Sequence, residues 1–349
     1  MKIHKFGNLK LYEYKPTIIA EVGVNHNCDL KLAKKYIRLC KESRADAVKF
    51  QTYKADKIVA KKSPAYWDMK EERTKTQYEL FKKYDKFNYK EYLSLFKECK
   101  KKKIKFMSTL FDLDSIDEYS NLIKVFKVSS SDINNYPLLK KISLQKKHII
   151  LSTGGSSLKE IKKALRILNL PKRKVCIMHC VLNYPTLDKF ANLKFIQKLK
   201  KEFPEYIIGY SDHVKSDSSL TQVQLAYEFG AQIIEKHFTH NKKLRGNDHY
   251  HSMDKDDLLN FQKIMERRKI LQGKEFKNLY NEIKSIKYAR RAIYAKKNIQ
   301  KFKKISSADI IPLRPCVNGV SVSRWNTVIG KRLNRNLKTG DIFKESYFN

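Results

Sequence analysis

Residues 18–51 read IIAEVGVNHNCDLKLAKKYIRLCKESRADAVKFQ. The stretch opens with an apolar, β-branched run, continues with apolar residues three and four positions apart, and closes with a second apolar run. This order predicts a strand, a helix and a strand, because buried strands are short apolar runs and amphipathic helices repeat near every 3.6 residues. Both runs end in polar residues, in EVGVNHN and in KFQ. Such residues belong either to a solvated loop or to an active site.

Units of this kind recur along most of the chain. The predicted strands are Thr17–Gly23, Asp46–Gln51, Ile104–Thr109, Val125–Ser129, His148–Thr153, Val175–Cys180, Tyr206–Tyr210 and Gln232–His237. Eight strand–helix units predict an α/β fold of the (β/α)8 TIM-barrel type. An open doubly wound sheet is the alternative. The absence of a G-x-G-x-x-G motif at the start of any helix disfavours a dinucleotide-binding form of that sheet.

Two segments depart from the repeated unit. Residues Lys54–Tyr89 are too long for a simple strand-to-helix loop, so we predict an insertion with its own helix over the barrel mouth. After Tyr288, short β-like runs with Pro and Gly turns replace the long helices. We therefore predict a barrel with a connecting helix, Asp256–Ile286, over residues 1–286, and a small β-rich domain over residues 287–349.

Composition is typical of a globular protein. Hydrophobic residues make up 42% of the 349 positions, and no apolar run approaches the roughly 18 residues of a membrane span. The N-terminal residues lack the apolar segment of a secretory signal. The six cysteines form no C-x-x-C pair, so we expect reduced thiols in a cytoplasmic protein rather than a disulfide framework or a zinc ribbon.

The formal net charge of +38 raises the question of an anionic partner. Most of the excess is lysine dispersed over predicted helices, as in KKALRILNLPKRK, and no nucleic-acid-binding motif accompanies it. We interpret the charge as a solvated surface and expect neither a nucleic-acid nor a membrane partner. A non-catalytic barrel that binds polyanions is an alternative, and it predicts a disrupted set of polar residues at the strand ends.

All eight predicted strands end in polar residues, and the active sites of TIM barrels lie at those ends. The polar residues are Glu21, Asn25 and His26; Lys49 and Gln51; Ser108 and Thr109; Lys127, Ser129 and Ser130; Ser152 and Thr153; Asn183 and Tyr184; Ser211, Asp212 and His213; and Glu235 and His237. Any one of them could be a hydrogen-bonded core residue. Eight polar ends that converge on one face of a barrel predict a catalytic site.

The residue types indicate two kinds of chemistry. Lysine supplies point charge and hydroxyls donate hydrogen bonds, which together predict a cradle for an oxyanion. Its members are Lys49, Lys127, Ser130, Ser152 and Ser211. His213 and His237 end neighbouring strands beside Glu235 and Asp248, and they could hold a divalent ion with open coordination positions. The alternative is a pair of hydrogen-bonded histidines.

A set of motifs occurs in a fixed order along the chain. It comprises IIAEVGVNHN, ADAVKFQ, FMSTLFD, FKVSSSDINN, ILSTGGSS, HCVLNYPT, IGYSDH, IIEKHFTHNKKLRGNDHYHSMD and RPCVNGVS. Together these motifs resemble the sialic acid synthase family. The resemblance implies a TIM barrel followed by an antifreeze-like (SAF) domain in a domain-swapped homodimer. It also implies condensation of phosphoenolpyruvate with an N-acylated mannosamine-type sugar to a nine-carbon sialic acid and phosphate, with Mn2+ or Mg2+ required.

The resemblance also implies roles for single residues. Phosphoenolpyruvate would be held by Lys49, Thr109, Lys127, Ser130, Ser152, Asn183 and Ser211, and the metal by His213 and His237. The sugar and the reacting carbons would be surrounded by Glu21, Gln51, Tyr184 and Asp248, with Glu21 as the base that deprotonates water. Arg314, from the small domain of the partner subunit, would reach the acyl group of the sugar. Asn183 stands one position from where some members carry a phosphate-contacting asparagine, and Leu182 occupies that place.

The chain departs from the family pattern at several positions. Cys28, Arg44 and Cys316 stand where the family usually has glycine, and Leu110 replaces a proline. Replacing a glycine at a position with positive φ destabilises the fold by about 1 kcal/mol. The sequence therefore does not predict whether these loops keep the family's conformation. The leading prediction is a synthase of the N-acetylneuraminate type. The alternative is a legionaminic or pseudaminic acid synthase with the same chemistry on a different sugar.

Overall fold

The computed structural model describes residues 4–67, 69–246 and 248–348. The chain divides into two units, residues 1–272 and 273–349. Each unit has its own hydrophobic core, as separate domains do.

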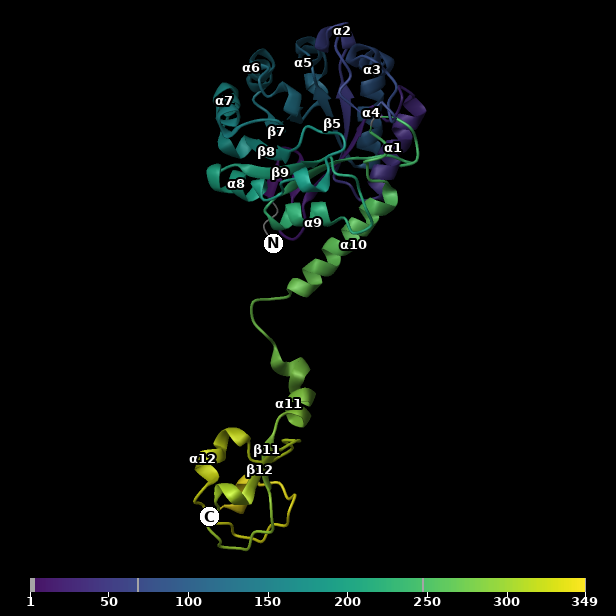
Figure 1. Cartoon of the computed structure of the whole chain (residues 1–349). Coiled ribbons are helices and arrows are strands. Elements are labelled where there is room, and N and C mark those ends of the chain that lie inside the picture. The colour runs from purple at the N-terminus through teal and green to yellow at the C-terminus, as the bar shows by residue number, and fades with distance from the viewer. Residues whose placement is uncertain (1–3, 68, 247, 349) are drawn as a thin grey trace. The chain divides into compact units, whose positions relative to one another are not determined.

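Eight parallel strands of the first unit close into a barrel (Figure 1). They are β3 (Thr17–Gly23), β4 (Ala47–Thr52), β5 (Lys105–Leu110), β6 (Val125–Val128), β7 (His148–Ser152), β8 (Val175–Cys180), β9 (Ile207–Asp212) and β10 (Ile233–His237). Strand β10 pairs with both β9 and β3, so the sheet has no edge. This closure confirms the predicted (β/α)8 barrel and excludes the open sheet. The predicted strand ends match the observed ones to within one or two residues.

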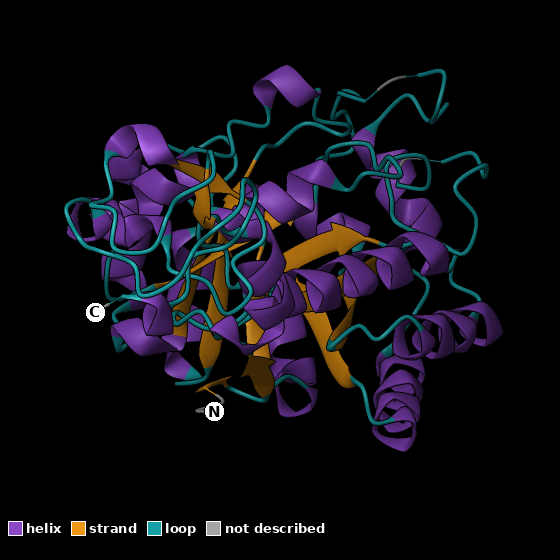
Figure 2. Ribbon diagram, turned by 90° about the horizontal axis from the view of Figure 1, so that it is seen from below, coloured by secondary structure: helices purple, strands orange, loops and turns teal. Residues whose placement is uncertain are grey.

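Helices cover the outside of the barrel (Figure 2). They are α1 (Leu30–Glu42), α4 (Tyr89–Lys102), α5 (Leu113–Tyr119), α6 (Tyr136–Leu144), α7 (Leu158–Leu168), α8 (Phe195–Glu202), α9 (Thr221–Glu228) and α10 (Lys255–Gln272). Helix α1 illustrates why these segments fold as they do. Asp29 caps its N-terminus by accepting hydrogen bonds from the backbone N–H groups of Lys31 and Leu32. Its buried residues recur at the predicted three- and four-residue spacing and are Ala33, Tyr36, Ile37 and Cys40.

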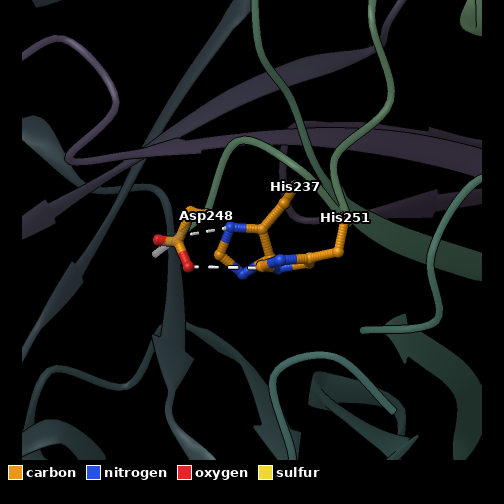
Figure 3. Close-up of side chains that lie close together, drawn as sticks. All are labelled: His237, Asp248 and His251. Carbon is orange, nitrogen blue, oxygen red and sulfur yellow. Dashed lines mark ion pairs between the residues drawn. The ribbon is translucent and has the colours of Figure 1, made fainter. Parts of the chain in front are cut away.

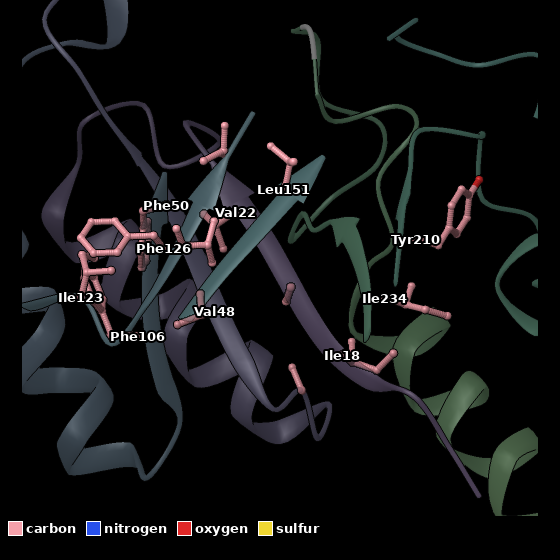
Figure 4. Close-up of a cluster of buried hydrophobic side chains, with 14 of the residues drawn as sticks. Ile18, Val22, Val48, Phe50, Phe106, Ile123, Phe126, Leu151, Tyr210 and Ile234 are labelled. Carbon is pink, nitrogen blue, oxygen red and sulfur yellow. The ribbon is translucent and has the colours of Figure 1, made fainter. Parts of the chain in front are cut away.

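The outward-facing strand residues pack into one continuous core (Figure 4). Val22, Val48, Phe50 and Phe126 belong to it, together with the buried residues of α1. The strands therefore carry apolar side chains even on the face that points away from the barrel axis. Because the strands are buried on both faces, they can be recognised in the sequence as short apolar runs.

The barrel interior is apolar toward the N-terminal ends of its strands. Its interior cluster includes Ile19, Ala47, Met107, Ile150 and Ile233, and it is completed by Phe6, Leu9 and Leu11. The last three come from an antiparallel hairpin of β1 (His4–Phe6) and β2 (Leu9–Leu11). The sequence did not predict this hairpin, because strands of three residues are too short for a periodic signal.

Strand geometry places the polar residues at the opposite end of the interior. Successive side chains of a strand face opposite sides, so the next inward-facing residue lies two positions further on. Two positions beyond the apolar residues just named stand Glu21, Lys49, Thr109, Ser152 and Glu235. The interior apolar cluster and the polar residues at the barrel mouth are thus consecutive layers of side chains in one barrel.

The insertion between β4 and α4 contains two short helices. They are α2 (Ala55–Ile58) and α3 (Gln77–Tyr84). A capping box starts α3: the Thr76 side chain accepts from the Glu79 backbone N–H, and the Glu79 carboxylate accepts from the Thr76 backbone N–H. The predicted insertion with its own helix is confirmed.

The second unit is small and built from short elements. Strands β11 (Ala292–Ala295) and β12 (Ile310–Leu313) form an antiparallel pair, and helices α11 (Ile283–Ala289) and α12 (Trp325–Val328) are short. Its core comprises Ile293, Ala295, Ile299, Ile305, Ile310, Val320, Val328, Leu333, Leu337 and Phe343. The predicted β-rich character is confirmed. The predicted domain boundary after residue 286 lies within this unit.

The segment between the units is not one helix. Helix α10 ends at Gln272, and a 3-10 turn (Leu279–Glu282) precedes α11, so the predicted helix Asp256–Ile286 is interrupted. Gly273 has φ of 58°, the left-handed conformation that ends helices. The buried residues of α10 stop at Met265, so no packed face holds the following residues in a helix. No helix within the described ranges has the length and apolarity needed to cross a membrane.

Candidate active site

A cavity of about 360 Å³ lies at the C-terminal ends of the barrel strands. The predicted residues that line it are Glu21, Lys49, Gln51, Thr109, Lys127, Ser130, Ser152, Tyr184, Ser211, His213, His237 and Asp248. These side chains come from strands and loops all around the barrel. Closure of the sheet, rather than proximity in the sequence, brings them together.

Four buried charged side chains face one another in this cavity. The Nζ of Lys49 lies 2.7 Å from Oε2 of Glu21 and 3.6 Å from Oε1 of Glu235. The Nζ of Lys127 donates to Oε1 of Glu235 at 2.9 Å. All four residues are at most 5% exposed. We call them the lysine–glutamate cluster; its two positive and two negative charges balance, as burial of ions requires.

The protonation of these groups follows from burial and pairing. Burial would lower the pKa of Lys49, but the carboxylates of Glu21 and Glu235 outweigh it and raise that pKa. Burial would raise the pKa of Glu235, but Lys127 and Lys49 outweigh it and lower that pKa. For Glu21 burial dominates, and the pKa is raised in spite of Lys49. Burial, together with the charge of Glu21, also raises the pKa of Asp248 to about 7.

Hydroxyl groups surround the cluster. Oγ1 of Thr109 accepts from Nζ of Lys49 at 2.8 Å, and Oγ of Ser211 donates to Oε1 of Glu235 at 3.4 Å. The Oγ of Ser152 is buried and makes no hydrogen bond to any residue that the structure describes. An unsatisfied buried hydroxyl costs about 1–3 kcal/mol, which an oxygen of a bound ligand would relieve.

Two histidines and a carboxylate meet beside the cluster (Figure 3). Nδ1 of His237, at the end of β10, lies 3.6 Å from Oδ2 of Asp248. Nε2 of His251 lies 3.9 Å from Oδ1 of the same carboxylate. The three residues offer ligand atoms within 4.8 Å of one another, a group that could hold a metal ion. Burial lowers the pKa of both histidines well below the usual range, so both are the neutral form that binds metals.

His213, the other predicted metal ligand, lies next to this group. Its ring centroid is 5.5 Å from that of His237 and 4.0 Å from that of Tyr184. Its Nδ1 contacts the carbonyl oxygen of Val181 at 2.7 Å, so a metal bound by His213 would be held through Nε2. A backbone carbonyl that fixes the tautomer is a common support for a metal-ligating histidine.

Residues that the sequence did not single out also belong to the cavity. Tyr66, Gln77 and Phe81 reach it from the insertion, which therefore contributes to the mouth as predicted. Glu235 was expected only beside the histidines, but it contacts both lysines. His251 was not predicted at all; its position three residues after Asp248 is the signal that could have revealed it.

Of the residues to which the resemblance assigns a role, Asn183 and Arg314 do not line this cavity. Asn183 is exposed and lines a neighbouring cavity, whereas Leu182 and Tyr184 on either side of it line the main one. Arg314 belongs to the second unit, where it is exposed after β12, and its role in a partner's site stays a prediction.

The polar cavity at the strand ends and the small β-rich unit after the barrel define a TIM-barrel enzyme with an appended domain. The NeuB family model matches residues 36–277, and the SAF domain model matches residues 290–348. The chain belongs to the NeuB family.

Several of the proteins it resembles are synthases of sugar acids. The N,N'-diacetyllegionaminic acid synthase of Campylobacter jejuni is 39% identical over 340 residues, covering 95% of this chain and 99% of that protein. The synthase of the same name from Legionella pneumophila is also 39% identical, covering 93% and 92%. The solved N-acetylneuraminic acid (sialic acid) synthetase of Leptospira borgpetersenii, in complex with citrate, is 34% identical with a TM-score of 0.67, covering 82% and 95%.

Proposed function

We propose that this protein is a synthase that condenses phosphoenolpyruvate with an acylated hexosamine and releases phosphate. One observation carries the proposal: the buried lysine–glutamate cluster shares a cavity with His237 and Asp248, two members of a group that could hold a metal ion. Fixed cations suit a doubly ionised phosphoester, and a metal-binding group suits an aldehyde that must accept electrons. Membership of the NeuB family supports the same chemistry.

The sugar that we propose carries two N-acetyl groups. The sequence favoured a synthase of the N-acetylneuraminate type, and the comparisons favour the alternative. The relatives that match 93–95% of this chain at 39% identity make N,N'-diacetyllegionaminic acid, as their names state, whereas the sialic acid synthetase is 34% identical over 82%. A product with two N-acetyl groups implies a hexosamine with both, because phosphoenolpyruvate supplies none.

Lys49 and Lys127 hold the anionic groups of phosphoenolpyruvate in this proposal. The hydroxyl of Ser152, which lacks a partner among the described residues, adds a hydrogen bond to one of its oxygens. C3 of phosphoenolpyruvate forms a bond to the aldehyde carbon of the open-chain sugar, and the aldehyde oxygen takes up a proton. Water then adds to the electron-deficient C2 and gives up one proton to a base. The resulting C2 hydroxyl loses its second proton as the C2–O bond breaks, so C2 becomes a ketone and phosphate leaves with its bridging oxygen. The fixed lysines stabilise phosphate charge throughout.

Glu21 is the proposed base for the water that adds to C2. Its Oε1 accepts a hydrogen bond from Nε2 of Gln51 at 2.9 Å, and its Oε2 faces Lys49, so the carboxylate is held in one orientation. Its raised pKa brings proton exchange closer to neutral pH, where a general base is most effective.

A divalent ion, Mn2+ or Mg2+, belongs to the proposal, with His213 and His237 as its ligands. The residues fit such an ion, because Nδ1 of His237 is buried and has no hydrogen bond to any described residue, and Asp248 adds a carboxylate oxygen. When bound, the ion would act as a Lewis acid toward the aldehyde oxygen of the sugar.

Phosphate release with a panel of sugars tests the proposal. The panel contains mannosamine, N-acetylmannosamine and a 2,4-diacetamido hexosamine, each with phosphoenolpyruvate and Mn2+. We expect release only when both substrates are present, with the highest kcat/KM for the diacetamido sugar. A higher value for N-acetylmannosamine would restore the sialic acid assignment. Equal release from phosphoenolpyruvate alone would indicate a phosphatase and refute the synthase.

A further inference from the structure

His251 is a buried side chain that the chemistry above does not use. It lies on the loop between β10 and α10 and is 0% exposed. Neither of its ring nitrogens makes a hydrogen bond to any residue in the described part of the chain. Leaving a buried polar group unpaired costs about 1–3 kcal/mol, so each such group calls for an explanation.

The groups within reach of His251 are metal-ligand types. Its Nε2 lies 3.9 Å from Oδ1 of Asp248, and its ring centroid is 5.0 Å from that of His237. The carboxylate is too far for a hydrogen bond. Ligands about 2.1 Å from one octahedral ion lie about 3.0–4.2 Å apart, so donors within 4.8 Å need inward shifts of only about 0.5 Å.

Aromatic neighbours hold the ring in this orientation. Tyr184 and Tyr250 stand edge-on to His251, with ring centroids at 5.9 Å and 5.2 Å. A ligand whose rotamer is set by packing loses little freedom when an ion binds. A shared ion accounts for the burial of His251 without a partner and for the carboxylate at near-ligand distance, and the packed ring holds His251 ready to bind it.

We propose that His251 is a further protein ligand of the divalent ion, beside His237 and Asp248. The assignment rests on the proposed function, which supplies the requirement for an ion. Two imidazoles and a carboxylate leave positions open for His213, water and an oxygen of the sugar. Nitrogen ligands favour Mn2+ over Mg2+, because Mg2+ prefers oxygen donors and binds less tightly in the divalent series. We therefore expect this site to bind Mn2+ more tightly than Mg2+.

Binding of Mn2+ and Mg2+ without substrates tests this assignment. We compare the wild type with His251→Ala, His251→Gln and the control His249→Gln, using titration calorimetry and the EPR signal of free Mn2+. His249 lies on the same loop, but its Nδ1 is occupied by Oγ1 of Thr239 at 2.8 Å. Loss of a ligand should weaken Mn2+ binding at least about 10-fold, since even second-shell losses cost 10–100-fold. His249→Gln should weaken Mn2+ binding by clearly less than about 10-fold, because the hydrogen-bond partner of the His249 ring is Thr239 and not a proposed ligand.

Pulsed EPR of bound Mn2+ counts the nitrogen ligands directly. We expect the 14N couplings of the wild type to decrease in His251→Gln and to persist in His249→Gln. Unchanged couplings together with unchanged Mn2+ affinity in the His251 variants would overturn the assignment. If His251→Ala does not fold, comparison of the 14N couplings of His251→Gln with those of the wild type still tests whether His251 is a ligand.

The same preparations separate this inference from the proposed function. Mn2+-dependent phosphate release with intact binding in the His251 variants would refute only the ligand assignment. Weakened binding in those variants, without phosphate release from any sugar, would support the ligand assignment and refute the synthase.

Discussion

Glu235 shows how a single residue sets the electrostatics of the cavity. One of its oxygens, Oε1, contacts Lys127 at 2.9 Å, Ser211 at 3.4 Å and Lys49 at 3.6 Å. In the free protein this carboxylate neutralises the lysines that would bind phosphoenolpyruvate. Glu235 therefore holds the lysines in place, and an arriving anion must compete with it.

Replacing this carboxylate by an amide should have two opposite effects. Glu235→Gln should lower the free energy of unfolding of the ligand-free protein by about 2–4 kcal/mol. This is somewhat less than the cost of removing one partner of a buried ion pair altogether, because the amide oxygen still accepts a hydrogen bond. It should tighten phosphoenolpyruvate binding by up to about tenfold, since about 1.4 kcal/mol of competition is removed. Urea unfolding and calorimetric titration measure the two effects.

A surface glutamate provides the control for this substitution. Glu202, the last residue of α8, pairs at the surface with Lys198 of the same helix and with Lys162 of α7. Ion pairs at such sites contribute little to stability. Glu202→Gln should leave both quantities unchanged. Weaker phosphoenolpyruvate binding in Glu235→Gln would mean that positioning of the lysines outweighs the competition.

Two residues at positions where the resemblance implies glycine adopt the conformation that glycine favours. Cys28 has φ of 56° and Arg44 has φ of 65°, both in the left-handed region. Such a residue costs about 1–2 kcal/mol relative to a relaxed backbone. The loop shape is thus kept at the expense of stability. Cys316 is not among the residues with positive φ, so the third replacement carries no such strain.

At the scale of elements, α4 ends on a residue that glycine would suit better. Lys103 follows the last residue of α4 with φ of 55°, and its N–H bonds to the carbonyl oxygens of Cys99 and Lys100. Lys103→Gly should raise the free energy of unfolding by about 1 kcal/mol, because glycine has no Cβ to strain in this cap. Chemical denaturation measures the change.

The same substitution inside the helix should have the opposite sign. Lys97 is exposed on α4, one and a half turns earlier, and Lys97→Gly should cost about 1 kcal/mol through lost helix propensity. Destabilisation by both variants would show that the backbone at Lys103 is not under strain.

Asp309 anchors the 3-10 turn before β12 in the second unit. It is buried and accepts hydrogen bonds from the backbone N–H and hydroxyl of Ser306 and from Nζ of Lys303 at 2.8 Å. Burial would raise the pKa of Asp309, but the hydrogen bonds from Lys303 and Ser306 outweigh it and hold that pKa well below its usual range.

The depressed pKa of Asp309 predicts acid sensitivity of the second unit. Its contribution to stability is complete above the unfolded pKa, near about 4, and is lost as the pH falls toward the lower folded pKa. Unfolding of this unit can be followed by the fluorescence of Trp325 in a Trp67→Phe background, since the chain has only these two tryptophans. Between pH 5 and pH 3 its stability should fall more steeply than in Asp309→Asn. Equal slopes would assign the acid sensitivity to other groups.

At the scale of the whole molecule, the resemblance to sialic acid synthases predicts that Arg314 acts in the partner's site. A planar guanidinium can order several hydrogen bonds to an acyl group. Arg314→Ala should therefore raise the KM for the sugar much more than the KM for phosphoenolpyruvate. Steady-state kinetics with each substrate varied in turn measures the difference.

Mixed dimers distinguish action in the partner's site from action in the same chain. After subunit exchange between Arg314→Ala and Lys127→Ala chains, half of the dimers are mixed and each has one intact site, so roughly a quarter of wild-type activity should return. Each variant exchanged with itself is the control. No recovery in verified mixed dimers would place Arg314 in its own chain's site, or in none.

Much of the barrel could be predicted because its strands are buried on both faces. A largely apolar run such as Val175–Cys180, between helical segments, has the length typical of a buried strand. The β1–β2 hairpin and the end of α10 at Gln272 were not predicted, because the sequence carries little pattern that marks them. Three-residue strands carry too little pattern, and the helical pattern after Met265 has no packed face to support it.

The sequence by itself determined which side chains stand at the strand ends, since alternation along each strand follows from local geometry. Only the tertiary structure decided which of them meet. Closure of the barrel through the pairing of β10 with β3 brings Glu235 to the lysines near Glu21, and the loop after β10 carries His251 to His237. The physical reason is that strand periodicity is encoded in neighbouring residues, whereas contacts across a closed barrel depend on register and loop packing among residues far apart in the chain.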